Sequence, residues 1–212
     1  MTLEAVQTTG HPAGTPGFRR LNAALWCAGA GTFTLLYAVQ GLLPAFSSEY
    51  GVSPATASLS LSVATGALAL GIIPVSVLAE AWGRDRVMAA SLTTTALLGV
   101  LAPLAPSFEV LVALRGLQGL AMAGVPALAM GHLAREVDGR ALGAAMGVLI
   151  AGNTVGGLSG RVVATLLADL GGWRLGMAGV AVVSFGCLIG FRVLLPTPRF
   201  DPPPRVPLRL LG

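Results

Sequence analysis

Residues 147–161, GVLIAGNTVGGLSGR, lie inside a long apolar run and carry five glycines, one amide and one arginine. In water, each glycine inside a helix weakens it by roughly 1 kcal/mol relative to alanine. In lipid, small residues spaced four apart let helix backbones approach closely. A charged side chain at membrane depth is costly and points to function. The stretch therefore predicts a membrane helix with a glycine packing face, formed by Gly147, Gly152, Gly156, Gly157 and Gly160.

The whole chain has the composition of an integral membrane protein. Of its 212 residues, 54% are hydrophobic and only 10% are charged, whereas soluble domains carry about 25% charged residues. Cys27 and Cys187 both lie in apolar runs, without histidine or cysteine at metal-ligand spacing, so we interpret them as small buried hydrophobes. We expect neither a disulfide framework nor a metal or cofactor.

Six continuous apolar runs follow one another, each near the roughly 20 residues that a helix needs to cross a membrane. Because they show no two-residue alternation, helices are favoured over a barrel. We expect an all-α membrane protein in which residues 19–197 form a six-helix transmembrane bundle. Residues 1–18 are interpreted as a disordered cytoplasmic tail and the proline-rich residues 198–212 as a cytoplasmic linker or tail. The predicted helices cover residues 21–46, 55–79, 87–105, 108–131, 141–167 and 173–195.

The arginines predict the orientation. They gather before the first run, between the second and third, between the fourth and fifth, and after the sixth, while the opposite loops contain only Arg174. By the positive-inside rule, both termini are expected in the cytoplasm, which requires an even number of crossings. We expect a multi-pass protein of the inner membrane.

Three patterns occur in order along the chain. SVLAEAWGRDR at 76–86 is a tight turn with a glycine and paired opposite charges. LRGLQG at 114–119 places Arg115 about 10 Å inside the outer end of its helix, with Gln118 on the same face. A guanidinium there stays charged and needs an anion, backbone carbonyls or water. Together with GNTVGG at 152–157, these patterns resemble the N-terminal six-helix half (a 3+3 inverted repeat) of a major facilitator superfamily transporter.

The resemblance is strongest to the proton-coupled efflux branch of that superfamily, which includes arabinose-efflux-like permeases and multidrug exporters. The family loop pattern is Gly-x-x-x-Asp-(Arg/Lys)-x-Gly-Arg-(Arg/Lys); here Ser76 replaces the first glycine, Ala81 replaces a cation and Asp85 reverses a charge. The resemblance implies a loop that gates transport through contacts with the other half, the alternative being a solvated turn. The implied gating residues are Glu80, Gly83, Arg84 and Arg86.

The other two patterns imply a transport site. LRGLQG matches Arg-x-x-Gln-Gly, whose arginine the family links to proton coupling, although snorkelling to the interface is an alternative. GNTVGG has the spacing of the exporter pattern Gly-Pro-x-x-Gly-Gly, with Asn153 in place of the helix-kinking proline. In this fold the first and fourth helices line the cavity, and hydrogen bonds to neighbouring helices are the alternative role for each side chain. The candidate substrate or coupling residues are Tyr37, Gln40, Arg115, Gln118, Asn153 and Arg161.

An enzymatic alternative is weak. The string Gly157-Leu-Ser159-Gly160 is also found in intramembrane serine proteases, but the only histidines, His11 and His132, lie too far away in sequence and depth to serve as its base. No catalytic site is expected. The acidic residues all lie in loops or at span ends, so a proton-binding carboxylate would be Glu109 or would come from a second half.

The length of the chain leaves several alternatives open. A complete carrier of this family needs about twelve helices, because substrate binds between two halves that rock against each other. The chain can be a truncated carrier, one half of a split carrier, or one copy of a homodimer; a non-transporting scaffold or fragment is the alternative from a different class. We expect transport of a small organic solute, with the lipid bilayer and a second half or second copy as partners, and no nucleic acid.

Overall fold

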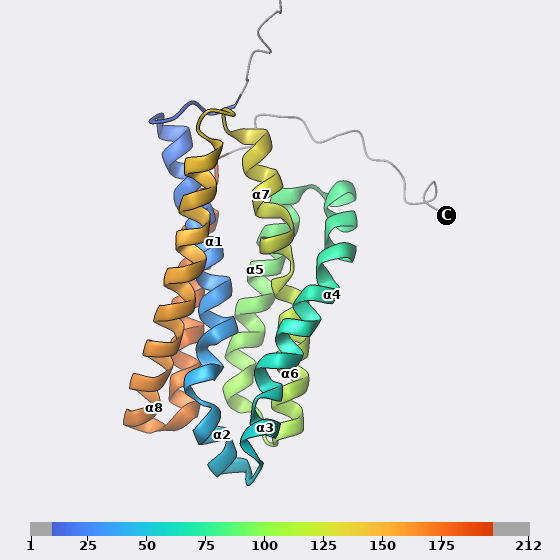
Figure 1. The fold of residues 1–212 in the computed structure, drawn as a ribbon, viewed down its shortest axis with the longest axis vertical. Helices are drawn as coiled ribbons and strands as arrows, with labels where there is room; N and C mark the ends of the chain where they lie inside the picture. The colour runs from blue at the N-terminus through green and yellow to red at the C-terminus, as the bar shows by residue number, and fades with distance from the viewer. Residues whose placement is uncertain (1–9, 197–212) are drawn as a thin grey trace, which may run out of the picture.

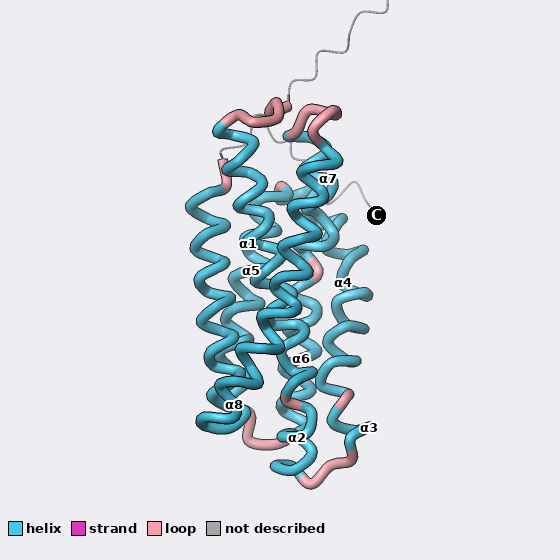
Figure 2. The backbone as a smooth tube through the Cα atoms, turned by 60° about the vertical axis from the view of Figure 1, so that its left-hand side comes forward, coloured by secondary structure: helices cyan, strands magenta, loops and turns pink. Residues whose placement is uncertain are grey.

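The computed structural model describes residues 10–196 and is helical almost throughout. Its long helices run along one axis and form an elongated bundle (Figures 1 and 2). Five helical segments of the described residues are long and apolar enough to cross a membrane. The prediction of an all-α membrane protein is therefore confirmed. The predicted linker at 198–212 and residues 1–9 of the predicted tail lie outside the described residues.

The first long segment is interrupted. Helix α1 (Pro16–Ala38) begins with proline in its first turn, and the side chain of Thr15 accepts a hydrogen bond from the Phe18 N–H at 3.3 Å. After Ala38 the backbone tightens into a 3₁₀ turn, η1 (Val39–Gly41), and then continues as α2 (Leu43–Tyr50). The sequence predicts one continuous helix here, so the break is a feature that the structure adds.

The next elements complete the half of the bundle seen on the right in Figure 1. A short helix α3 (Pro54–Ala57) leads into α4 (Leu59–Trp82). The chain then reverses at Gly83, whose φ of 89° favours glycine. The following elements are α5 (Arg84–Leu101), η2 (Ala102–Leu104), α6 (Phe108–Met122) and α7 (Gly124–Glu136).

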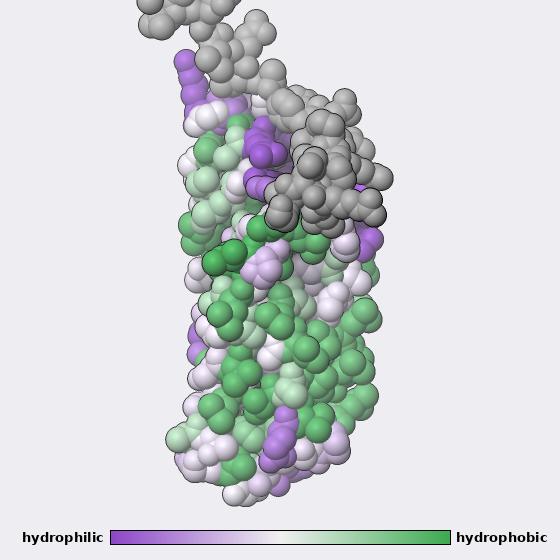
Figure 3. Space-filling model, turned by 90° about the vertical axis from the view of Figure 1, so that its right-hand side faces the viewer, coloured by the Kyte–Doolittle hydropathy of each residue, from purple (hydrophilic) through white to green (hydrophobic). Residues whose placement is uncertain are grey.

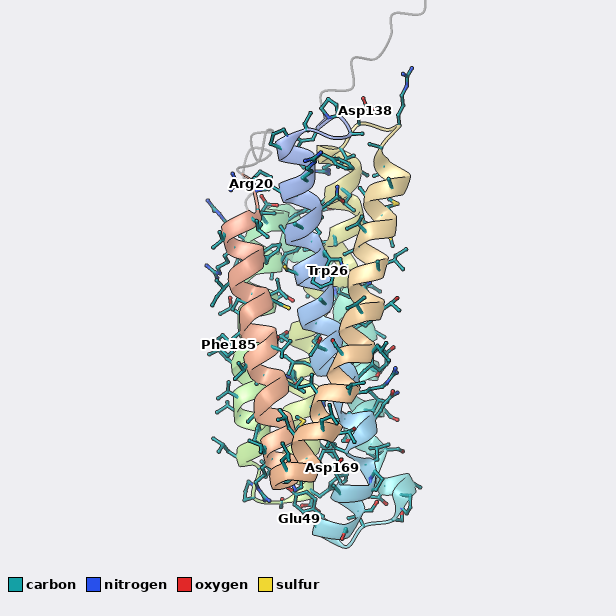
Figure 4. All side chains as sticks on the ribbon, turned by 90° about the vertical axis from the view of Figure 1, so that its left-hand side faces the viewer. Arg20, Trp26, Glu49, Asp138, Asp169 and Phe185 are labelled. Atoms are coloured by element: carbon teal, nitrogen blue, oxygen red, sulfur yellow. The ribbon has the colours of Figure 1, made fainter. Side chains whose placement is uncertain are left out.

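The last helix, α8 (Leu142–Leu194), folds back on itself. A straight helix of its 53 residues would be about 80 Å long. Gly171 and Gly172 instead leave the helical region, with φ of −155° and +79°. Residues 142–170 and 173–194 form two legs that lie side by side (Figures 1 and 4). The predicted count of six crossings depends on α8 crossing twice.

Part of the predicted disordered tail is ordered. Helix α1 already begins at Pro16, and His11 forms a parallel bridge with Val137. The His11 N–H donates to the Glu136 carbonyl at 2.7 Å, and the Asp138 N–H donates to the His11 carbonyl at 3.2 Å. Backbone pairing and the capped helix start therefore order residues that polar composition assigns to a tail.

The packing suits a lipid environment. The core consists of two apolar clusters, one toward each end of the bundle, contributed by all the long helices. Several large apolar side chains point outward, among them Leu70 at 77% and Leu170 at 80% exposure. On the face seen in Figure 3, hydrophobic side chains cover the middle of the bundle and hydrophilic ones gather toward its ends. Such an exposed apolar belt is satisfied by hydrocarbon rather than by water.

Candidate functional site

Three glycines of the α8 first leg lie directly against the backbone of α1. A Cβ atom at any of them would meet a backbone carbonyl of α1. Both helices step by four residues along this contact, and the Thr34 hydroxyl donates to the Gly156 carbonyl at 3.0 Å. The facing pairs are Gly152 with Trp26, Gly156 with Ala30, and Gly160 with Thr34. We call these six residues the glycine contact.

The remaining residues of the predicted glycine face have different surroundings. A Cβ at Gly157 would lie 3.0 Å from the Tyr37 ring, so this glycine makes room for the tyrosine. Gly147 has open space where a Cβ would lie. The Asn153 side chain fills the space above Gly29, and its Oδ1 is buried without a hydrogen-bond partner among the described residues.

Arg115 lies in α6 and is fully buried. Its guanidinium donates to the carbonyls of Leu35 at 3.1 Å, Leu36 at 2.9 Å and Ser60 at 3.2 Å, and to the Gln118 side chain. Four hydrogen bonds nearly exhaust its five donors. Of the partners that a membrane arginine can have, Arg115 therefore takes backbone carbonyls and one amide, and Glu109 is not among them.

The break in α1 explains these carbonyls. Leu35 and Leu36 belong to the last turn of α1, where the change to η1 removes intrahelical partners from terminal carbonyls. Gln118 lies one turn after Arg115 and donates from Nε2 to the Thr95 carbonyl at 3.0 Å. Arg115 and Gln118 thus join α6 to α1, α4 and α5 around the end of α1.

Arg161 has a different environment, on the first leg of α8. Its Nε donates to the Gln40 side-chain oxygen, and its Cζ lies 4.8 Å above the centre of the Tyr37 ring. All three residues are half-buried. We call Tyr37, Gln40 and Arg161 the Arg161 cluster. The Phe33 ring, 5.9 Å from that of Tyr37, extends it along α1.

The six predicted substrate or coupling residues therefore form separate groups. Arg115 and Gln118 are buried together, and the Arg161 cluster is half-buried at the α1–α8 surface. Asn153 lies two turns before Arg161 on the same leg, against Gly29. Within residues 10–196, no hydrogen bond joins the buried pair to the Arg161 cluster.

The predicted gating loop contacts the end of α7. Asp85 pairs with His132 at 3.1 Å between Oδ1 and Nδ1, and the Arg84 guanidinium occupies the space beside Gly131. Glu80 and Arg86 are exposed. The sequence does not indicate the Asp85–His132 pair, because Asp85 stands out there only as a departure from the family pattern.

The opposite end of the bundle carries a second contact between charged side chains. Arg174 pairs with Glu49 at 2.6 Å and covers the Trp173 ring, with its Cζ 4.4 Å from the ring centre. Phe46 and Tyr50 pack against the same indole with ring centres 5.2 and 5.8 Å away. These contacts fix α2 to the start of the second leg of α8.

Comparison with known proteins gives one family. A sequence profile of the Major Facilitator Superfamily matches residues 25–210. The chain is 40% identical over 199 residues to the Uncharacterized MFS-type transporter YybF of Bacillus subtilis (strain 168), covering 94% of this chain and 49% of that protein. It is 37% identical over 186 residues to the Inner membrane transport protein YnfM of Escherichia coli (strain K12), covering 88% and 45%. It is 32% identical over 182 residues to the Chloramphenicol resistance protein of Streptomyces lividans, covering 82% and 46%.

These matches agree with the helical architecture. The chain spans about half the length of the curated relatives that it matches. Their names point to a membrane transporter rather than an enzyme. The apolar helices and the family profile together show that this multi-pass membrane protein belongs to the major facilitator superfamily.

Proposed function

We propose that the chain is a six-helix half of a major facilitator carrier, and that it takes part in proton-coupled efflux of a small organic solute across the inner membrane. The observation that carries the proposal is the Arg161 cluster: a half-buried cation, amide and tyrosine beside a break in a membrane helix. Carriers of this type bind substrate near the midplane, where discontinuous helices expose polar groups.

The depth of the cluster supports this role. Arg161 lies ten residues before the reversal at Gly171, or about 15 Å along the helix. This is about half of the roughly 30 Å hydrocarbon thickness. A polar group at that depth faces the protein interior or a water-filled cavity rather than lipid.

The reversal within α8 supports six crossings. Residues 142–170 and 173–194 are each long enough to cross the hydrocarbon, with the reversal at Gly171–Gly172 between them. Six crossings place both termini on one side, and the arginine distribution makes that side the cytoplasm. The first three crossings and the last three crossings would then form the two halves of the 3+3 repeat.

Efflux and proton coupling have separate support. The glycine spacing of residues 152–157 is that of exporters in this family, and one relative is named a chloramphenicol resistance protein. The Arg115 pattern is the one that the family links to protons. Acidic residues of the described chain lie at helix ends, so the proposal places the proton-binding carboxylate in a second half.

The proposal therefore requires a second half, from a partner chain, a second copy or further sequence. The predicted gating residues Glu80, Gly83, Arg84 and Arg86 would then control closure of the cytoplasmic side against that half. A scaffold or fragment without transport is the competing function.

Transport in everted membrane vesicles tests the proposal. Cells would express the chain alone, or together with the adjacent reading frame, and vesicles would be screened for accumulation of labelled organic solutes, beginning with chloramphenicol. We expect accumulation that a protonophore abolishes. Absence of accumulation under both conditions would favour the scaffold, and accumulation that is insensitive to the protonophore would remove proton coupling from the proposal.

A further inference from the structure

We infer that the Arg161 cluster is an anion subsite that binds the carboxylate of an organic solute. The inference deepens the proposed function, because it names the chemical class of the solute, and it rests on that function for the claim that the solute is transported.

The first argument is the number of unused donors. Arg161 donates one hydrogen bond, from Nε to Gln40, and the described residues provide no other hydrogen bond or ion pair to its guanidinium. A guanidinium has five N–H donors, so four remain. Arg115, in contrast, already makes four hydrogen bonds, and its side chain is fully buried. Of the two membrane arginines, only Arg161 can accept a ligand without losing protein contacts.

The second argument is orientation. The guanidinium carbon of Arg161 lies over the Tyr37 ring, and the Gln40 side-chain oxygen accepts from its Nε. These two contacts hold the position of the group and use its Nε, while Nη1 and Nη2 make no hydrogen bond to the described residues. The edge that Nη1 and Nη2 form matches a carboxylate, which accepts two parallel hydrogen bonds from it. Lysine could supply the charge but not this fork.

The third argument is charge. The other close contacts between acidic and basic side chains of the described residues lie near the ends of the bundle: the Glu49–Arg174 salt bridge and the Asp85–His132 contact. No carboxylate accompanies Arg161 within residues 10–196, and an uncompensated cation at membrane depth is unfavourable. An anionic ligand removes this penalty, whereas a neutral or cationic ligand leaves it. Beside the cation, the Phe33 and Tyr37 rings give the organic part of the solute an apolar surface.

Ligand-dependent stability of the full chain tests the inference. The purified chain in phosphatidylcholine nanodiscs would be melted with benzoate, benzamide or benzylamine, which share a ring and differ in charge. At about 10 mM, we expect benzoate to raise the Tm by about 2 °C or more, because bound ligand stabilises the folded state. The neutral amide and the amine should leave the Tm unchanged.

Variants assign the effect to the cluster. Arg161→Gln should abolish the benzoate shift, and Arg161→Lys should retain part of it, since the charge stays and the fork is lost. Arg174→Gln is the matched control: it removes an arginine that is exposed and already paired with Glu49, and the benzoate shift should persist.

Three results would overturn the inference. The first is no benzoate shift in the unmodified chain, and the second is an equal shift with benzamide. The third is a shift produced only by short-chain phosphatidylglycerol, which would assign the cation to a lipid headgroup. The assay measures binding without transport, so benzoate binding without vesicle transport contradicts the proposed function alone. Transport without charge-selective binding contradicts the anion subsite alone.

Discussion

Arg115 donates to three carbonyls and an amide, whereas Arg161 donates to one amide and stacks on a tyrosine. The two side chains contact the same short region of the chain, because Leu35 and Leu36 accept from Arg115, and Tyr37 and Gln40 contact Arg161. One arginine therefore stabilises the interrupted end of α1, and the other leaves donors for a ligand.

This difference predicts the effect of removing Arg115. Arg115→Leu should lower the free energy of unfolding by about 2–4 kcal/mol, because it leaves buried acceptors on Gln118 and on the end of α1 without a donor. Unfolding in increasing concentrations of a denaturing detergent would measure the loss in free energy of unfolding. Arg174→Gln, at an exposed pair, should change stability by less than about 1 kcal/mol. Equal effects of the two substitutions would contradict the assignment of Arg115 to the fold.

The sequence could predict part of this chemistry. Helical spacing alone places Gln118 beside Arg115, and the structure shows their hydrogen bond. The carbonyl partners could not be predicted, because they lie far away in sequence in other helices. Leu35 and Leu36 precede Arg115 by 80 and 79 positions in α1, and Ser60 precedes it by 55 positions in α4. Main-chain acceptors leave no signature in side-chain patterns, so a break in a helix is invisible until the backbone is known.

At the scale of elements, the glycine contact decides how α1 and the first leg of α8 pack. Gly156→Leu should force the two backbones apart and lower the free energy of unfolding by about 2–3 kcal/mol. Gly147→Leu, on the same leg with open space at its Cβ, should not lower the free energy of unfolding and should raise it by about 0.5–1 kcal/mol, because leucine favours the helix more than glycine does. Denaturant unfolding of both variants checks the difference, and comparable losses would contradict the role of the glycine contact.

The reversal of α8 predicts that replacing glycine by alanine changes the free energy of unfolding in opposite directions at two positions of this helix. Gly172 has a φ of +79° and a ψ of 170°, which only glycine adopts readily, so Gly172→Ala should destabilise by about 1–3 kcal/mol. Gly186 is helical with open space around it, so Gly186→Ala should stabilise by about 0.5–1 kcal/mol. Thermal unfolding of the two variants is the measurement. A stable Gly172→Ala variant would show that α8 does not need this turn.

The positions of the long helices were largely predictable, because a helix that crosses lipid needs a long apolar run. Polar or glycine-containing loops separate these runs in the sequence. The predicted gap between residues 167 and 173 includes the reversal at Gly171–Gly172. The predicted first helix, in contrast, ran through the 3₁₀ turn at Val39–Gly41, because hydrophobicity continues across it. The length of an apolar run thus predicts that a segment crosses the membrane, but not whether its helix is continuous.

For the whole molecule, the arrangement predicts which loops share a side of the membrane. Figure 4 shows Arg20 and Asp138 toward one end of the bundle and Glu49 and Asp169 toward the other. With Cys27 and Cys187 replaced by serine, Asp169→Cys should react with a membrane-impermeant maleimide in intact cells. Arg140→Cys, in the exposed turn next to Asp138, should react only after the membrane is opened. The reverse pattern would invert the proposed topology, and equal labelling of both positions would contradict a double crossing by α8.

The glycine contact also has a mechanical consequence. Two helices that touch through their backbones lack the layer of side chains that deforms when neighbouring helices slide, so α1 and the first leg of α8 should behave as one stiff beam. A beam of about 40 Å that tilts by about 10° moves its far end by about 7 Å. When such a beam rotates about the end at one membrane surface, its other end therefore moves furthest, and the Arg161 cluster, partway along the beam, moves by a smaller amount.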